Sequence, residues 1–208
     1  MSGCLIFDLD GTLVDSRADL CTGVNLMRRE FGLPPLPPEQ VGGYLGNGTV
    51  ALCERSLAGT GVDPVTALPL MKHYYSVHLL DQTRLYPGVA ETLRRVDAAG
   101  WRLAVVSNKL ETPCRDILDG LGVGALFPVI CGGDSGFGLK PAPEPLFHVL
   151  ETLQVAPEES YMVGDNYTDL AAGRAAGVGR IFAAYGFGAP HGETCDRQIQ
   201  SFSELTTI

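Results

Sequence analysis

Two aspartates near the start of the chain have a spacing that suits metal-assisted chemistry. Asp8 and Asp10 follow the apolar run from Cys4 to Phe7, and a turn at Gly11 and Thr12 comes directly after them. Alternation in an extended chain puts both carboxylates on one side, with Cα atoms roughly 7 Å apart. Such carboxylates repel each other unless a cation lies beside them, and oxygen-only ligands suit Mg²⁺. The pair therefore predicts a Mg²⁺ site, although aspartates also simply end strands and cap turns.

Three later stretches carry polar side chains that could complete this site. Ser107 and Asn108 follow one apolar run, Asp165 follows another, and Asp169 comes one helical turn later. Lys140 lies in a loop that two prolines stiffen. Ligands of open parallel sheets bind beyond the carboxyl ends of the strands, so we expect these groups to meet there. Four carboxylates, a hydroxyl and an ammonium group suit phosphoryl transfer.

The chemistry of these groups indicates their possible roles. One strand-end aspartate can attack phosphorus to form an aspartyl-phosphate, and its neighbour can exchange protons with the leaving group and with water. The Ser107 hydroxyl can donate to a phosphoryl oxygen, and Lys140 can offset negative charge as a compact cation. Mg²⁺ can screen the nucleophile from the phosphate and hold the two in line.

Composition narrows the classes of partner. The net charge of −9 in 208 residues argues against binding to nucleic acid. The sequence shows no long apolar run and no pattern of a signal peptide, so we expect a cytoplasmic protein without membrane contact. The six cysteines form no CxxC pair, which indicates reduced and mostly buried thiols. The expected partner is a small phosphorylated metabolite, and the oligomeric state is left open.

The pattern of elements predicts an α/β fold with a parallel sheet. Short apolar runs alternate with helical periodicity from residue 83 onward, which is typical of a sheet covered by helices on both faces. Residues 17–82 show helical periodicity alone, with Ser16 as the first N-cap. We therefore expect a Rossmann-like core, residues 1–16 and 83–208, with an inserted helical cap, residues 17–82. The expected strands are residues 4–7, 101–106, 128–131, 161–163 and 179–184, and the expected helices are residues 16–31, 49–58, 63–80, 88–99, 111–121, 143–153 and 166–176.

Four stretches together resemble the motifs of the haloacid dehalogenase (HAD) superfamily. They are the stretch from Asp8 to Val14, Ser107-Asn108, Lys140-Pro141 and the stretch from Gly164 to Asp169. The resemblance implies that Asp8 is the nucleophile and Asp10 the general acid and base. It also implies that Mg²⁺ binds to Asp8, Asp165 and the carbonyl of Asp10. Asp169 would act on metal-bound water or on Lys140.

Details of the sequence favour a phosphatase within this superfamily. Dehalogenases lack the second aspartate, because a halide leaving group needs no proton, and Leu20 stands where β-phosphoglucomutases carry a histidine. The insertion after the first motif resembles a C1-type cap. Two stretches, Gly46-Asn47-Gly48 and Ser107-Asn108-Lys109, resemble phosphoglycolate phosphatases, and together with Lys140 they would contact substrate. Alternatively, the glycines only turn the chain between helices and Lys109 is a solvated surface lysine.

The function that these observations favour is Mg²⁺-dependent hydrolysis of a small phosphomonoester, with 2-phosphoglycolate as the first candidate. The core motifs contact only the phosphoryl group, so sugar phosphates, nucleotides and pyrophosphate stay open as alternatives. A catalytically weak binding protein on the same fold is a further alternative. The presence of both Asp8 and Asp10 argues against it, because a protein without turnover needs no acid.

Overall fold

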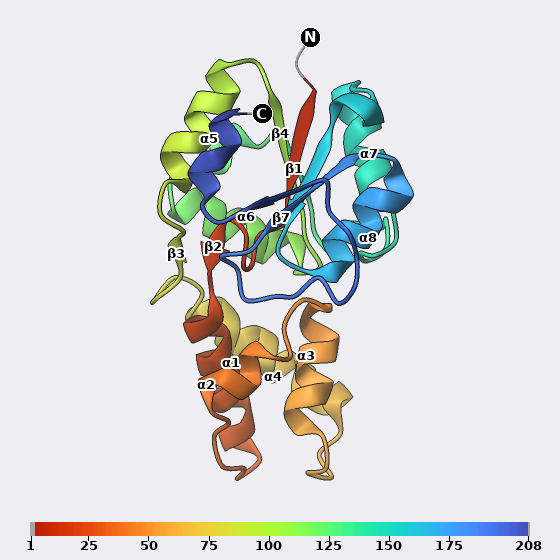
Figure 1. Ribbon diagram of the computed structural model, residues 1–208. Coiled ribbons are helices and arrows are strands. Elements are labelled where there is room, and N and C mark those ends of the chain that lie inside the picture. The colour runs from red at the N-terminus through yellow and green to blue at the C-terminus, as the bar shows by residue number, and fades with distance from the viewer. Residues whose placement is uncertain (1–2, 208) are drawn as a thin grey trace.

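The short apolar runs form a six-stranded parallel sheet in the computed structural model, which describes residues 3–207 (Figure 1). The strand order is β5-β4-β1-β6-β7-β8, so the strand that carries Asp8 at its end lies inside the sheet. This arrangement confirms the predicted fold class. The strands are β1 (Cys4–Phe7), β4 (Arg102–Val106), β5 (Val129–Cys131), β6 (Tyr161–Gly164), β7 (Gly179–Ala183) and β8 (Arg197–Ile199).

Alternation along β1 sends its side chains into two separate apolar clusters. Leu5 and Phe7 belong to the cluster on the side of α5 and α6, whereas Cys4 and Ile6 belong to the cluster of α7 and α8. All four side chains are fully buried, because helices cover both faces of a parallel sheet. Figure 1 shows these two helix layers on opposite sides of the sheet. The helices are α5 (Val89–Ala98), α6 (Glu111–Gly120), α7 (Glu144–Leu153) and α8 (Tyr167–Ala176).

Four helices from the first half of the chain form a separate bundle beyond the carboxyl end of β1 (Figure 1). Within this bundle, α4 packs against α1 and α3. Between residues 17 and 82 the structure describes no strand. The bundle corresponds to the predicted cap, and its boundaries at residues 16 and 83 stay a prediction. The helices are α1 (Arg17–Glu30), α2 (Pro38–Gly42), α3 (Gly48–Leu57) and α4 (Pro64–Val77).

The two chain segments that connect the bundle to the sheet pair with each other. β2 (Val14–Asp15) and β3 (Arg84–Leu85) form an antiparallel two-stranded ribbon. Beside it, the buried Asp19 carboxylate accepts hydrogen bonds from the backbone N–H groups of Gln82 and Thr83 and from the Thr83 hydroxyl, at 2.7–3.0 Å. These bonds fix the start of α1 to the end of the cap, so the two connections behave as one unit.

Short elements are where the sequence prediction and the structure differ. Residues 33–38, which include four prolines and were not predicted as helix, lead into the short helix α2. This helix begins at Pro38, because a helix does not need the missing N–H of its first residue. The strands β2, β3 and β8 were also not predicted, because they have two or three residues each and are too short to show a period of two. All of the remaining predicted helices and strands are present, with ends that differ by up to three residues.

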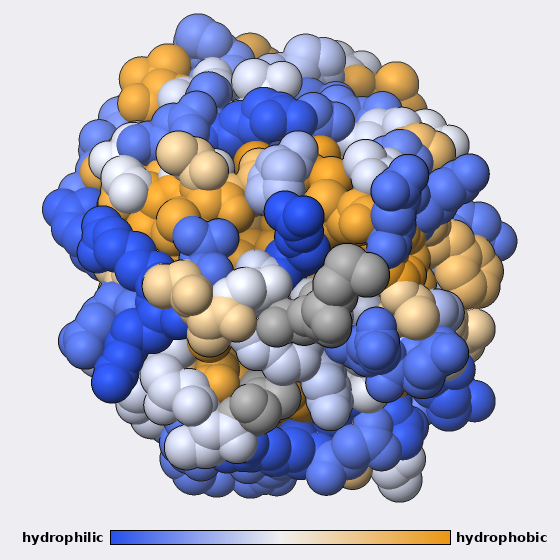
Figure 2. Space-filling model, turned by 90° about the horizontal axis from the view of Figure 1, so that it is seen from above, coloured by the Kyte–Doolittle hydropathy of each residue, from blue (hydrophilic) through white to orange (hydrophobic). Residues whose placement is uncertain are grey.

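The thiols are free and mostly buried, as the sequence predicted. All six cysteines are free, and five of them are buried. Among residues 3–207, no helix has both the length and the apolar character needed to cross a membrane. Figure 2 shows the end of the molecule away from the cap, where hydrophilic residues surround smaller areas of hydrophobic ones.

Asp19→Ala should lower the free energy of unfolding by about 3 kcal/mol. The donors of Gln82 and Thr83 would lose their charged, buried acceptor. Urea denaturation measures this change. Asp81→Ala is the matched control, since Asp81 is an exposed cap aspartate paired with His78, and its effect should stay within about 0.5 kcal/mol. Equal effects of both substitutions would contradict a structural role for Asp19.

Candidate active site

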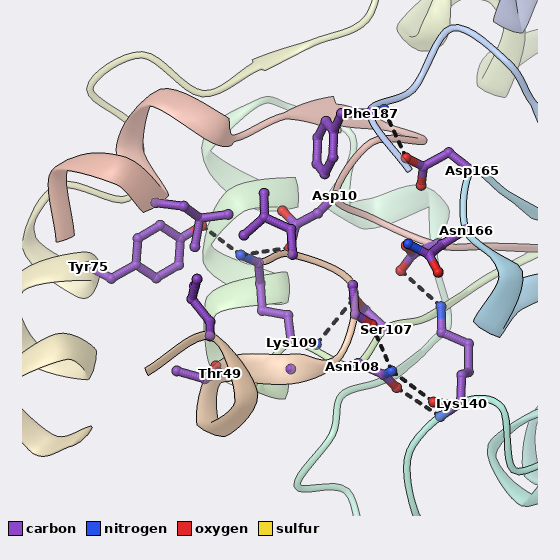
Figure 3. A pocket seen from close by; sticks show the side chains of 16 residues that line it. Asp10, Thr49, Tyr75, Ser107, Asn108, Lys109, Lys140, Asp165, Asn166 and Phe187 are labelled. Carbon is purple, nitrogen blue, oxygen red and sulfur yellow. Dashed lines mark hydrogen bonds and ion pairs between the residues drawn. The ribbon is translucent and has the colours of Figure 1, made fainter. Parts of the chain in front are cut away.

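Three polar side chains of the site follow directly after three adjacent strands. Asp8 follows β1, Ser107 follows β4 and Asp165 follows β6, and these strands are neighbours in the order β4-β1-β6. Asp8 continues the pairing, because its backbone N–H donates to the Val163 carbonyl at 2.9 Å. All three polar side chains are buried and line one pocket between the sheet edge and the cap. Figure 3 shows this pocket from close by.

Lys140 connects two of the predicted carboxylates. Its ammonium nitrogen lies 2.9 Å from Asp8 Oδ1, 2.7 Å from Asp169 Oδ1 and 2.5 Å from the Val106 carbonyl oxygen. Burial by itself would lower the pKa of Lys140, but Asp169 and Asp8 outweigh it and raise that pKa. Lys140 is therefore a permanent cation whose three N–H donors are all used.

Asn108 holds the lysine loop in place. Its side-chain oxygen accepts from the Lys140 backbone N–H at 2.8 Å, and its amide donates back to the Lys140 carbonyl at 2.9 Å. The same amide also donates to the Gly46 carbonyl of the cap at 3.0 Å. Asn108, predicted as a substrate contact, lines the pocket. Its side-chain hydrogen bonds go to Lys140 and Gly46, so they join its own segment to the lysine loop and to the cap.

Asp165 is held by the glycine-rich loop of residues 186–192, whose role in the site the sequence left open. Its Oδ2 atom accepts from the backbone N–H groups of Phe187 and Gly188 at 3.0 and 2.7 Å. The loop approaches so closely that a Cβ atom on Gly186 would lie 2.4 Å from Asp165 Cβ. On the other side, a Cβ on Gly11 would lie 2.1 Å from Asp165 Oδ2. Glycine is needed at both positions, and only their glycine content could have pointed to the close approach.

Burial and neighbouring charge act together on Asp165. Burial, Asp8 and Asp169 raise the pKa of Asp165 to about 8, although the two backbone N–H groups oppose this shift. Asp169 is fully buried, and its Oδ2 atom accepts from the Asn166 N–H in the capping box of α8. The start of α8 thus fixes Asp169 against Lys140.

The same region has the donor set of a divalent cation site. Oxygen atoms of Asp8, Asp165 and Asp169 lie within 4.8 Å of one another, and the three side chains are buried. When all groups are ionised, four negative and two positive charges leave two negative charges uncompensated. A divalent cation would balance them with oxygen ligands only. The groups counted are Asp8, Asp10, Asp165, Asp169, Lys109 and Lys140.

The Asp10 carboxylate lies outside that cluster and has its own partners. Its Oδ1 atom accepts from the Ser16 hydroxyl at 2.5 Å, and its Oδ2 atom pairs with the Lys109 ammonium at 2.9 Å. Ser16 was expected as the N-cap of α1, but its side chain makes no cap hydrogen bond. The prediction that Asp10 binds the metal concerns its carbonyl oxygen, and it stays a prediction.

Lys109 is not a solvated surface lysine. Its side chain is 6% exposed, and besides Asp10 it contacts the Tyr75 hydroxyl at 2.6 Å (Figure 3). Tyr75 belongs to α4 of the cap, so this contact joins the cap to the predicted acid. Neither Tyr75 nor Ser16 was predicted as a site residue. The helical periodicity of α4 accounts for Tyr75, and the position of Ser16 directly before α1 suggested only a helix cap.

The residues of the Gly46-Asn47-Gly48 turn do not all face the pocket. Gly46 and Gly48 line the pocket, but Asn47 does not. Its amide instead donates to the Tyr167 hydroxyl at 3.2 Å, and its oxygen accepts from Arg55 at 2.8 Å. Asn47 therefore joins the cap to α8 outside the pocket.

Three comparisons with known proteins agree with this geometry. The model of the family described as haloacid dehalogenase-like hydrolase matches residues 5–183. A phosphoglycolate phosphatase of Chromobacterium violaceum is 37% identical over 205 residues, which cover 96% of this chain and 92% of the relative. One of Nitrosospira multiformis is 36% identical over 213 residues, with 98% and 94% covered. A crystal structure of a predicted phosphoglycolate phosphatase from Haemophilus somnus 129pt has a TM-score of 0.93 at 29% identity and covers 99% of this chain and 97% of its own.

Binding of a divalent cation should tighten as the pH rises. Because the Asp165 pKa is raised to about 8, this carboxyl keeps its proton below that pH, and a bound cation must displace the proton. The affinity for Mg²⁺ should then rise up to about tenfold per pH unit from pH 6 to 8 and level off above it. Calorimetric titration at several pH values measures this.

Two variants control that experiment. The Asp165→Asn variant should bind Mg²⁺ weakly, and its affinity should lose the pH dependence that comes from this carboxyl. Asp97→Asn, an exposed change on α5, should keep the slope of the parent protein. An affinity that stays constant from pH 6 to 8 would contradict the role assigned to Asp165.

Proposed function

The chain belongs to the haloacid dehalogenase-like hydrolases, and from this premise we propose that it is a Mg²⁺-dependent phosphatase of 2-phosphoglycolate. The observation that carries the proposal is the placement of two aspartates at the end of β1 with different partners. Asp8 pairs with Lys140 beside the carboxylate cluster, whereas Asp10 pairs with Lys109 on the cap side. One group is thus arranged as a nucleophile and the other as a proton carrier.

In the first half of the proposed reaction, a carboxylate oxygen of Asp8 attacks phosphorus and the bond to the leaving oxygen breaks. An aspartyl-phosphate forms, and Asp10 in its protonated form gives its proton to the leaving oxygen. Ser107 supports the phosphoryl group. Its hydroxyl oxygen accepts from the backbone N–H of Lys109 at 3.3 Å, and its O–H has no acceptor among residues 3–207, so it can donate to a phosphoryl oxygen.

In the second half, water attacks phosphorus and the bond to Asp8 breaks, which releases phosphate and restores the carboxylate. Asp10 takes the proton of the water. Ser16 and Lys109 contact the two oxygens of Asp10, and these contacts support its proposed place beside the reacting groups. Lys140 keeps Asp8 in place during both halves through its contact at 2.9 Å.

Asp8 and Asp165, together with the carbonyl of Asp10, are the residues that we propose to hold Mg²⁺. When bound, the ion would screen the charge of the phosphate from that of the nucleophile. The donor set fits this ion, because it consists of oxygen atoms and carries two uncompensated charges. Asp169 acts through Lys140, to which it is bound at 2.7 Å.

The cap supports the choice of a small substrate. Its contribution to the pocket wall includes Leu20, Leu45 and Leu52, which exclude water from the reacting atoms. The curated relatives of similar length are phosphoglycolate phosphatases, and their names favour 2-phosphoglycolate over larger esters. Sugar phosphates and nucleotides serve as the comparison in the tests.

Asp8→Asn should reduce turnover of 2-phosphoglycolate at least about thousandfold, because an amide cannot act as the nucleophile. Asp10→Asn should reduce it about hundredfold to ten-thousandfold, which is the usual contribution of a general acid. Phosphate release at saturating substrate measures both, and circular dichroism checks the fold. Asp97→Asn on the surface is the matched control and should keep the parent rate. Unchanged turnover in Asp8→Asn would overturn the assignment of the nucleophile.

Removal of divalent cations with excess EDTA should lower the rate at least about hundredfold, and added Mg²⁺ should restore it. Ca²⁺ should restore much less, because it prefers more ligands at longer distances. The same assay with EDTA already saturated by Mg²⁺ controls for direct effects of the chelator. Full activity in excess chelator would count against a role for the ion.

A further inference from the structure

The ammonium groups of the two buried active-site lysines differ in how many hydrogen bonds they can still make. A protonated lysine has three N–H donors. Those of Lys140 meet three protein oxygens, as described above. Lys109 meets two acceptors among residues 3–207, Asp10 Oδ2 at 2.9 Å and the Tyr75 hydroxyl at 2.6 Å. One N–H of Lys109 therefore has no acceptor in the part of the chain that the structure describes.

Tyr75 has a second donor without an acceptor. Its hydroxyl oxygen accepts from Lys109, and within residues 3–207 no group accepts the hydroxyl proton. Burial raises the pKa of Tyr75, so the hydroxyl keeps its proton and stays a donor. Both residues line the pocket, and Figure 3 shows the tyrosine and the ammonium group side by side next to Asp10.

These two donors lie near the leaving group of the proposed reaction. Asp10 must approach the leaving oxygen to hydrogen-bond distance in order to protonate it. The Lys109 ammonium lies 2.9 Å from Asp10. If Asp10 gives its proton from Oδ2, the ammonium is within about 6 Å of the leaving oxygen, which is the sum of two hydrogen-bond lengths. A carboxylate separated from the leaving oxygen by one carbon atom falls within this range.

The charge of Lys109 suits an anionic group of the substrate. Burial disfavours the charged form of Lys109, but Asp10 outweighs this effect and raises the pKa, so the lysine is a cation. A carboxylate can accept two hydrogen bonds through its two oxygens. The cap side of the pocket contributes no charged side chain among the described residues, only groups such as Leu45, Thr49 and Leu52. A second phosphate or a sugar would find few polar partners there.

We propose that Lys109 and Tyr75 together form a carboxylate-binding pair that selects substrates with a carboxylate next to the phosphorylated carbon. Lys109 supplies an N–H and a positive charge from the sheet edge, and Tyr75 supplies an O–H from α4. Tyr75 is thus a specificity-determining residue of the cap, and it contributes when the cap lies against the core. The inference rests on the proposed function, since it concerns the leaving group of that reaction.

A pair of substrates isolates this role. 2-Phosphoglycolate and ethyl phosphate have the same phosphoryl group, but a methyl group replaces the carboxylate in the second. The parent protein should have a kcat/KM at least about hundredfold higher for 2-phosphoglycolate, because donors that lose their acceptor stay unpaired. Tyr75→Phe removes one donor and keeps the aromatic ring. It should lower kcat/KM for 2-phosphoglycolate about tenfold or more and change that for ethyl phosphate less than about threefold.

Two further variants complete the experiment. Tyr74→Phe is the matched control, because the Tyr74 hydroxyl lies on the same helix and donates to Glu30 on the surface. It should leave both substrates unchanged. Lys109→Gln should lower the rate for both substrates through its contact with Asp10, but the ratio between them should also fall at least about tenfold. This ratio gives a second readout if Tyr75→Phe proves unstable.

The outcomes separate the inference from the proposed function. If the parent protein hydrolyses 2-phosphoglycolate and Tyr75→Phe affects both substrates equally or neither, the carboxylate pair is wrong and the phosphatase stands. A preserved ratio in Lys109→Gln has the same meaning and would direct attention to the backbone at Gly46 and Gly48. If the parent protein hydrolyses neither ester in the presence of Mg²⁺, the proposed function itself is overturned, and the inference with it.

Discussion

The structure depends on one electrostatic constraint, the buried excess of negative charge where the carboxyl ends of β1 and β6 meet. Asp8, Asp165 and Asp169 are held together against their mutual repulsion, and Lys140 is the cation that contacts two of them. Burial, together with the repulsion from Asp8 and Asp169, raises the pKa of Asp165. A site with this imbalance favours a divalent cation over neutral ligands.

Two buried aspartates show how surroundings separate a structural carboxylate from a functional one. Asp19 and Asp165 both accept backbone N–H donors and both are almost inaccessible. No ionisable partner contacts Asp19 among the described residues. Its bonds join the start of α1 to Gln82 and Thr83 at the end of the cap. Asp165 faces Asp8 and Asp169, and this repulsion opposes its ionised form. The number of hydrogen bonds is similar, so the neighbouring charges decide which carboxylate is ready to bind a cation.

The cap is connected to the chemistry through the same residues that build the site. Asn108 joins the lysine loop to Gly46, and Lys109 joins Asp10 to Tyr75. A movement of the cap therefore changes contacts of residues that neighbour the nucleophile and the acid. This coupling gives the protein a way to link the identity of the leaving group to the arrangement of the reacting groups.

The sequence alone determined five of the six strands of the sheet, the helices that cover it and the residues at the strand ends. Their signals are local: apolar runs such as the one before Asp8, helical periodicity, and polar residues directly after strands. Tertiary structure decided the partners. Lys109 contacts the hydroxyl of Tyr75, which is 34 residues away in the sequence. Asp165 accepts from the backbone N–H of Phe187, which is 22 residues away. No local pattern encodes such contacts, because they arise only when the cap and the last loop pack against the sheet edge, and the same packing turned Asn47 away from the pocket.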